Sequence, residues 1–225
     1  MNLDVQKQNF DFLEGQTRAL VRWGQETFGA KVFLTSAFGI NGSVLLELVR
    51  PILPDVEIFF IDTGCHFAET LELRDHFRQK GFNVVEIGSE PRGNGRDFEE
   101  IGHDLCCQIN KVEPMNRLLA GRPEHLWITG LSRDQAETRR DIPFFQRLPS
   151  GVYKLSPLAG WRQSDIWAYT RQRGLIYNRL YDQGYASIGC RPCTTPVKPG
   201  EDLRAGRWRD TGKTECGLHP EKPFE

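Results

Sequence analysis

Residues 31–51 read KVFLTSAFGINGSVLLELVRP, and this stretch decides the fold. The apolar run at 31–37 is typical of a short buried strand. A glycine-bearing turn follows it and leads into an apolar segment that ends at Pro51, as a helix does before a proline. The stretch therefore predicts a strand, a loop and a helix in direct succession.

The same order repeats further along the chain. Residues 56–64, VEIFFIDTG, form a second apolar run that ends in Asp62 and Gly64. Residues 67–81, FAETLELRDHFRQKG, then resume a period of 3.6 up to Gly81. A second unit of strand, loop and helix is therefore predicted beside the first.

Further elements extend this pattern on both sides. Candidate strands are FNVVEI at 82–87 and HLWITG at 125–130, and a helix is predicted from about Gln108 to Leu119. Amphipathic helices are expected at 10–29 and 161–174. Strands that alternate with helices predict an α/β fold, a three-layer sandwich with a parallel sheet covered on both faces.

The last part of the chain has a different character. No regular element is expected beyond Tyr185, and prolines accumulate there. We expect one α/β domain over residues 1–200, which binds the ligands, and a flexible C-terminal tail over residues 201–225 that orders around a ligand.

Composition limits the functional class. The chain has 225 residues, 39% hydrophobic and 26% charged, as in ordinary globular proteins. A net charge of −1 argues against a general nucleic-acid surface, and no run approaches the ~18 apolar residues of a membrane span. We therefore expect a soluble, cytoplasmic protein with neither nucleic acid nor membrane as partner. Thiols stay reduced in the cytoplasm, so the six cysteines are expected to be metal ligands or redox catalysts.

Two pairs of cysteines indicate a metal centre. Cys190 and Cys193 lie in ASIGCRPCTTPVKPG, and Cys106 and Cys107 are adjacent in DLCCQINKVEP. Four unrelated buried thiols and a zinc site are the alternatives. Because side chains of adjacent residues point apart, they bind one small ion poorly and suit the separate iron atoms of a larger cluster. The pattern favours a [4Fe-4S] cluster over zinc, and Lys111, on the predicted helix, would lie near it.

The carboxyl ends of the predicted strands form a candidate nucleotide site. In open α/β sheets ligands bind beyond these ends, and here they carry TSAFGING at 35–42, IDTG at 61–64 and ITGLSRDQ at 128–135. Backbone N–H groups of the first loop can cradle an anion or a nucleotide, with Ser36 and Ser43 as further donors. The loop is not a P-loop, because no lysine precedes Ser43.

A single cysteine near the C-terminus has nothing to pack against in its hydrophilic surroundings. Cys216 lies in GKTECGLHP, and an exposed thiol of this kind favours a reactive role. His219, three residues later, can lower the pKa of that thiol or neutralise a bound anion. The preceding segment is basic, with Arg204, Arg207, Arg209 and Lys213 against Asp210.

From about Lys31 to Pro220 the chain resembles assimilatory adenylylsulfate (APS) reductases of the iron-sulfur type, among the sulfonucleotide reductases. The resemblance is carried by SAFG, DTG followed by ET, CC followed by KVEP, TGLSRDQ, CRPCT and ECGLH. It implies an adenine-nucleotide α-hydrolase-like fold, in agreement with the sheet predicted above.

The resemblance also implies roles for individual residues. Cys106, Cys107, Cys190 and Cys193 would bind the cluster, and Cys216, assisted by His219, would be the catalytic nucleophile. The implied substrate-binding residues are Ser36, Phe38, Gly39, Lys111, Gly130, Arg133, Arg139, Arg204 and Arg207.

The implied activity is the reduction of adenylylsulfate to sulfite and AMP through an S-sulfocysteine at Cys216. Thioredoxin or glutaredoxin would supply the electrons, and a homo-oligomer is left open. Three alternatives remain: the same chemistry on 3′-phosphoadenylylsulfate (PAPS), a pyrophosphatase acting on tRNA, which would need an SGGxDS loop that is missing, and a nucleotide-sensing iron-sulfur regulator without turnover.

Overall fold

A computed structural model describes residues 2–88 and 98–219, with side chains for 10–88 and 101–219. The end of the predicted tail, residues 220–225, and the glycine-rich segment at 89–97 lie outside the described residues. Among the described residues, no helix is long and apolar enough to cross a membrane.

A six-stranded sheet forms the centre of the molecule, in the order β3-β2-β1-β4-β6-β5. Five neighbouring strands run parallel, whereas β5 is antiparallel to β6 at the edge. The predicted α/β fold is thus confirmed, with one antiparallel strand that the sequence pattern did not indicate. The bounds are β1 Val32–Thr35, β2 Glu57–Asp62, β3 Val84–Gly88, β4 Leu126–Thr129, β5 Phe145–Arg147 and β6 Tyr153–Leu155.

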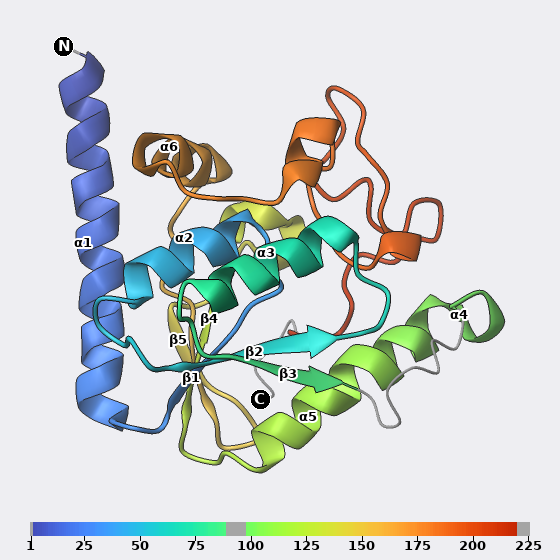
Figure 1. The fold of residues 1–225 in the computed structure, drawn as a ribbon, viewed down its shortest axis with the longest axis horizontal. Helices are drawn as coiled ribbons and strands as arrows, with labels where there is room; N and C mark the ends of the chain where they lie inside the picture. Colours follow the sequence, from blue (N-terminus) through green and yellow to red (C-terminus); the bar gives the residue numbers. More distant parts are fainter. Residues whose placement is uncertain (1, 89–97, 220–225) are drawn as a thin grey trace.

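Helices cover both faces of this sheet (Figure 1). Successive side chains of a strand point to opposite faces, so Leu34 of β1 enters one core while Phe33 enters the other. The first core packs against α1, α2, α3 and α6, and the second against α5. The bounds are α1 Asn2–Phe28, α2 Ile40–Val49, α3 Ala68–Gln79, α4 Phe98–Cys107, α5 Glu113–Ala120 and α6 Gln163–Arg173.

The helix predicted from about Gln108 is longer and less regular than expected. It begins with α4 and kinks at Gly102, whose φ of 75° is outside the helical region. A π-helical turn, η1 at Gln108–Val112, joins α4 to α5. Such turns widen a helix locally and are frequent at functional sites. This one carries Lys111 and directly follows the two adjacent cysteines.

The chain after Tyr185 is irregular, as predicted, apart from a short 3₁₀ turn, η5 at Arg191–Cys193, and an isolated bridge between Thr194 and Arg207. Figure 1 shows this orange and red part of the chain beyond the carboxyl ends of the strands. Three further 3₁₀ turns are η2 Arg133–Gln135, η3 Glu137–Arg139 and η4 Arg179–Gln183.

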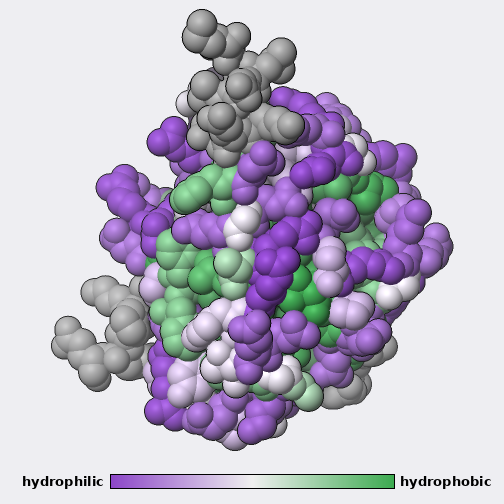
Figure 2. Space-filling model, turned by 90° about the vertical axis from the view of Figure 1, so that its left-hand side faces the viewer, coloured by the Kyte–Doolittle hydropathy of each residue, from purple (hydrophilic) through white to green (hydrophobic). Residues whose placement is uncertain are grey.

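The face that carries α1 is mixed in character. Figure 2 shows a mostly hydrophilic surface broken by apolar patches. Trp23 of α1 and Phe145 of β5 contribute half-exposed aromatic rings, with centroids 4.9 Å apart. This face is remote from the strand ends, where the polar loops gather.

Candidate active site

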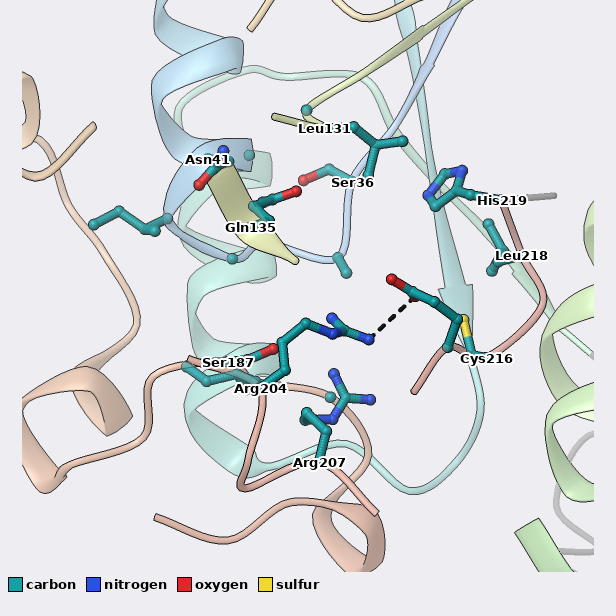
Figure 3. A pocket seen from close by; sticks show the side chains of 18 of the residues that line it. Ser36, Asn41, Leu131, Gln135, Ser187, Arg204, Arg207, Cys216, Leu218 and His219 are labelled. Carbon is teal, nitrogen blue, oxygen red and sulfur yellow. Dashed lines mark hydrogen bonds and ion pairs between the residues drawn. The ribbon is translucent and has the colours of Figure 1, made fainter. Parts of the chain in front are cut away.

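A cavity of about 260 Å³ lies at the carboxyl ends of β1, β2 and β4. The loop before α2 forms one wall, with Ser36 and Gly39, and Gly130 lies at the end of β4. Residues 186–190 and part of 203–219 form the other walls. Figure 3 shows Arg204 and Arg207 on one side of this cavity and Cys216, Leu218 and His219 on another.

The loop between β1 and α2 is shaped by an unusual residue. Phe38 has a φ of 52°, and its backbone N–H donates to Ser36 Oγ at 3.0 Å. This conformation turns the Phe38 ring away from the cavity into the first core, where it stacks on Phe77 with centroids 5.6 Å apart. Phe38 was expected among the residues that line the nucleotide pocket, but its neighbours Ser36, Ala37 and Gly39 line the cavity and Phe38 does not. Its side chain is buried in the first core instead.

The first turn of α2 presents backbone donors. Gly39 is the N-cap, and the N–H of Ile40 donates to the hydroxyl of Tyr181 at 3.1 Å. Ser43 is buried in the same turn, and its Oγ has no hydrogen-bond partner among the described residues. A helix N-terminus of this kind carries partial positive charge and suits an anionic ligand.

A polar network connects α2 to the loop after β4. Asn41 Nδ2 donates to Ser132 Oγ at 3.2 Å, and Gln163 Nε2 donates to Asn41 Oδ1 at 3.1 Å. Asn41 and Gln163 also line the cavity. Arg133 does not: its Nε donates to the carbonyl of Ile142 at 3.0 Å, and its guanidinium lies over Phe144. The side chain expected to bind substrate is thus engaged in holding the 133–144 loop.

The cysteines that are far apart in sequence meet beside this cavity. Cys107, Cys190 and Cys193 are buried in one cluster with Trp208, and Cys65 and Cys216 pack against it. Cys106 is half-buried on the same turn of helix, and Asn110 Nδ2 lies 3.6 Å from its sulfur. The donor set is therefore rich in sulfur, although no three His, Cys, Asp or Glu side chains of the described residues are placed to hold one metal ion.

Charge at the thiols depends on Lys111. Burial raises the pKa of Cys190, but the Lys111 ammonium and a hydrogen bond with Thr63 outweigh burial and leave this pKa below its ordinary value. Burial raises the pKa of Cys193 to about 11. Burial lowers the pKa of Lys111, yet the thiol groups of Cys190 and Cys216 leave it raised overall. The raised pKa keeps Lys111 protonated. Its side chain lies between the thiol cluster and the cavity and is one of the residues that line the cavity.

The tail is attached to the site by a carboxylate. Glu215 accepts from Arg139 Nε and Nη2, both at 2.9 Å, from Arg204 Nη2 at 3.1 Å and from Thr138 Oγ1 at 3.1 Å. Burial raises the pKa of Glu215, but the two arginines lower it below the ordinary value. Cys216, the next residue, is half-buried and lines the cavity.

His219 packs against the sheet in surroundings that disfavour its charged form. Its ring stacks on Trp127 of β4 with centroids 5.2 Å apart, and its Nδ1 is buried with no partner among the described residues. Burial, with Lys154 and Arg139 nearby, lowers the pKa of His219 well below 6.5. The sequence suggested that His219 neutralises an anion by its charge. In this position the lowered pKa disfavours the charged imidazole.

Of the expected residues, Ser36, Gly39, Lys111, Gly130, Arg139, Arg204, Arg207, Cys190, Cys216 and His219 line the cavity. Sequence reasoning missed Asn41, Gln163, Glu215 and Lys154. Glu215 had a signal, because it belongs to the quoted ECGLH motif. Lys154 had no such signal in the sequence, because a lysine in a three-residue strand is expected to be exposed to solvent. In the structure Lys154 is 3% exposed, and its Nζ lies 5.1 Å from the centroid of the Trp127 ring.

The chain is similar to known proteins of one family. The model of the phosphoadenosine phosphosulfate reductase domain matches residues 31–196. The chain is 39% identical to an adenosine 5′-phosphosulfate reductase of Bacillus velezensis over 210 residues, 89% of each chain. It is 43% identical to a phosphoadenosine 5′-phosphosulfate reductase of Gloeobacter violaceus over 203 residues, 85% of this chain and 83% of that protein.

Solved structures agree as well. A phosphoadenylyl-sulfate reductase from Candida auris, in complex with phosphate, superposes with a TM-score of 0.69 at 27% identity, over 84% of this chain and 96% of that one. An FMN adenylyltransferase of Candida glabrata, 15% identical with a TM-score of 0.65 over 86% of this chain and 67% of that one, shares the fold.

The fold and the cavity define a nucleotide-binding α/β protein with a thiol at its strand ends. More narrowly, the chain belongs to the phosphoadenosine phosphosulfate reductase family, whose domain model covers most of it, and is thus a member of an oxidoreductase family.

Proposed function

We propose that this protein reduces adenylylsulfate to sulfite and AMP in sulfate assimilation, with Cys216 as the nucleophile. One observation carries the proposal: the Cys216 side chain lines the same cavity as the N-terminus of α2 and the guanidinium groups of Arg204 and Arg207. A thiol, a nucleotide-binding loop and anion-binding cations thus share one site. The adenosine 5′-phosphosulfate reductases among the relatives support the choice of substrate.

The first step is a transfer of the sulfo group. The Cys216 thiolate attacks the sulfur of adenylylsulfate, the bond from that sulfur to the bridging oxygen breaks, and AMP leaves with the electron pair. Because one anion approaches another, cations must offset the repulsion. Arg207 and Lys111 line the same cavity as Cys216 and are suited to this task.

The second step restores the enzyme. A thiolate of a reduced dithiol protein, thioredoxin or glutaredoxin, attacks the Cys216 sulfur of Cys216–S–SO₃⁻. The sulfur–sulfur bond breaks, sulfite leaves, and the second thiol of the donor resolves the mixed disulfide. Two electrons pass from the dithiol to the sulfur. The tail must open for this step, so that segment 201–225 acts as a movable arm on the domain of residues 1–200. Reduced thiols and a dithiol donor fit a cytoplasmic location.

We also propose that Cys106, Cys107, Cys190 and Cys193 hold a [4Fe-4S] cluster. The four residues come from two segments that meet at one place, three of them in one buried group with Trp208, and cysteine thiolates are the ligands such clusters take. When bound, the cluster would supply an anchor between the π-helical turn and residues 190–193. Lys111 would remain beside it, directed at the cavity.

Nucleotide binding falls to the loop and the strand ends. Ser36, Gly39 and Gly130 line the cavity near the N-terminus of α2, where an anionic group is stabilised. We propose that Phe38 contributes its backbone and that Arg133 acts by holding its loop. Arg139 and Arg204 complete the positive wall of the site.

A labelling experiment tests this function. Anaerobically purified protein is mixed with ³⁵S-labelled adenylylsulfate in the absence of a dithiol, and label is expected on Cys216 by mass spectrometry. Addition of reduced thioredoxin should then release labelled sulfite. No label on Cys216, or unchanged sulfite formation in Cys216→Ser, would exclude the mechanism. A regulator without turnover would keep nucleotide binding in Cys216→Ser and form no sulfite in any variant.

The alternative substrate carries a 3′-phosphate, and the relative from Gloeobacter violaceus is named for it. Rates of sulfite formation from the two nucleotides, measured at equal concentrations, distinguish the two activities. We expect adenylylsulfate to be the faster substrate.

A further inference from the structure

Resting on the proposed function, we infer that Glu215 is a positioning residue: its carboxylate, clasped between Arg139 and Arg204, docks the tail so that Cys216 lies in the cavity. We call these three residues the clasp. Nothing in the sequence alone pairs Glu215 with Arg139, which lies 76 residues earlier.

The clasp is a largely buried polar attachment of the tail close to Cys216. The side chains of Arg139, Arg204 and Glu215 are 14%, 14% and 12% exposed. Four hydrogen bonds at 2.9–3.1 Å converge on the Glu215 carboxylate, two of them from Arg139 in fork geometry. Charge-assisted pairs of this geometry are the strong ones.

Residues 206–208 are held to the domain by backbone hydrogen bonds with Cys193 and Thr195. Nearer to Cys216, the other attachments of residues 213–219 are weaker or less directional. Lys213 pairs with Asp104 of α4, but the Asp104 side chain is 91% exposed, and exposed pairs add little. Leu218 packs against the second core, and His219 stacks on Trp127. These contacts bury apolar surface without fixing the register of the chain, whereas the clasp fixes the position of the residue next to Cys216.

The clasp also changes which arginine is available to substrate. Arg139 uses Nε and Nη2 on Glu215 and Nη1 on Gln135 at 2.7 Å. Arg204 Nη2 donates to Glu215 and to the carbonyl of Thr214 at 2.7 Å. Arg207, in contrast, lines the cavity with a buried Nε that has no partner among the described residues. Arg207 therefore offers the sulfo or phosphate group a buried donor that the clasp does not use.

Limited proteolysis tests the docking without any turnover. The Lys213 side chain is 15% exposed, so trypsin can cut after it only when the tail opens. We expect Glu215→Gln to raise the rate of this cut roughly tenfold, the effect of one lost charge-assisted contact. The matched control is Glu201→Gln, which removes another glutamate of the same segment, one that is paired with a single arginine, Arg209. The control should leave the rate unchanged, and equal rates for wild type and Glu215→Gln would overturn the inference.

A double-variant comparison and kinetics complete the test. Arg139→Gln should raise cutting as Glu215→Gln does, and the double variant should cut no faster than either single one, because the partners act as one unit. If the two substitutions instead multiply their effects on the cutting rate, the clasp is overturned.

Kinetics provide a separate test. In turnover, Glu215→Gln should lower kcat for sulfite formation with the Kd of AMP unchanged, and Glu215→Asp should restore part of kcat. If Glu215→Gln raises the Kd of AMP but leaves kcat and the rate of tryptic cutting unchanged, the inference is overturned. The proteolysis result stands even if Cys216 proves not to be the nucleophile.

Discussion

Gly189 lies directly under the guanidinium group of Arg207. A Cβ atom on Gly189 would be 2.2 Å from Arg207 Nη2 and 2.4 Å from its Cζ, closer than heavy atoms approach. The guanidinium also lies 4.4 Å from the centre of the Trp208 ring. Absence of a side chain at position 189 thus allows Arg207 to lie flat between the backbone and Trp208, at the wall of the cavity.

The first prediction follows from this contact. In Gly189→Ala the methyl group displaces the end of the flexible Arg207 side chain, and the backbone need not move. We expect kcat/KM for adenylylsulfate to fall roughly tenfold to a hundredfold, the cost of one lost charge-assisted contact. Arg207→Ala should cause a similar loss, since both changes remove the same group. Gly15→Ala, where a Cβ atom meets nothing within 4 Å, is the control and should retain activity. Unchanged kcat/KM in Gly189→Ala would contradict this role of Arg207.

Cluster binding is the second prediction. We expect each single serine substitution of a cluster ligand to abolish the bound iron and the brown colour, because a four-thiolate cluster needs all four ligands. The four variants change Cys106, Cys107, Cys190 and Cys193. Cys65 packs against the same group and is the matched control. Cys65→Ser should retain iron and acid-labile sulfide, measured after anaerobic purification. Iron loss in Cys65→Ser with retention in Cys106→Ser would reassign the ligands, and zinc in wild type would exclude the cluster.

The third prediction concerns the pH dependence of the docked tail. The pKa of His219 is lowered below 6.5 by burial, with Lys154 of β6, Arg139 of η3 and Arg204 facing it. The docked tail therefore disfavours protonation of His219. Its docking is most stable above pH 6.5, and this stability is lost as the pH falls below that value. Hydrogen exchange of residues 214–219, corrected for intrinsic rates, should accelerate from pH 7.5 to 5.5. His219→Phe should weaken this dependence. His125→Asn, at the other end of β4, should retain it.

Lys154 provides the fourth prediction, in the opposite pH range. Burial lowers the pKa of Lys154 from 10.5 to about 8, with Arg139 adding to the effect. Between pH 8 and 10.5 the folded state binds fewer protons than the unfolded chain, so the free energy of unfolding should rise with pH there. The contribution is about 3 kcal/mol at most. Urea unfolding of wild type and Lys154→Met, measured at pH 8 and 10, tests it. An equal change in both proteins would show that Lys154 is not the group responsible.

Local patterns in the sequence were sufficient for most of the sheet. The runs before Ser36 and Gly64 are apolar and end in glycine-bearing loops, and both are strands in the structure. The antiparallel edge strand β5 and its neighbour β6 were missed because each has three residues, too few for a period of two to appear. The π-helical turn at Gln108–Val112 was missed because its residues fit an ordinary helical pattern.

Residue types and spacing also indicated much of the site. The two cysteine pairs and the lone Cys216 were recognisable because cysteines in a reducing compartment are more often metal ligands or redox catalysts than disulfides. Sequence reasoning placed Phe38 and Arg133 at the ligand and His219 as a charged group. It could not detect that Phe38, with a φ of 52°, is buried in the core, or that burial lowers the pKa of His219.

By itself, then, the sequence determined strands β1 to β4 and most of the helices around them, the loops at the strand ends and the kinds of chemistry available, because these follow from neighbours a few residues apart. The tertiary structure alone decided which groups meet: Glu215 with Arg139, Cys190 with Lys111, and Gly189 with Arg207. The physical reason is that burial and charge act through space. A partner 76 residues away sets the pKa and the position of Glu215, and no local pattern records that distance.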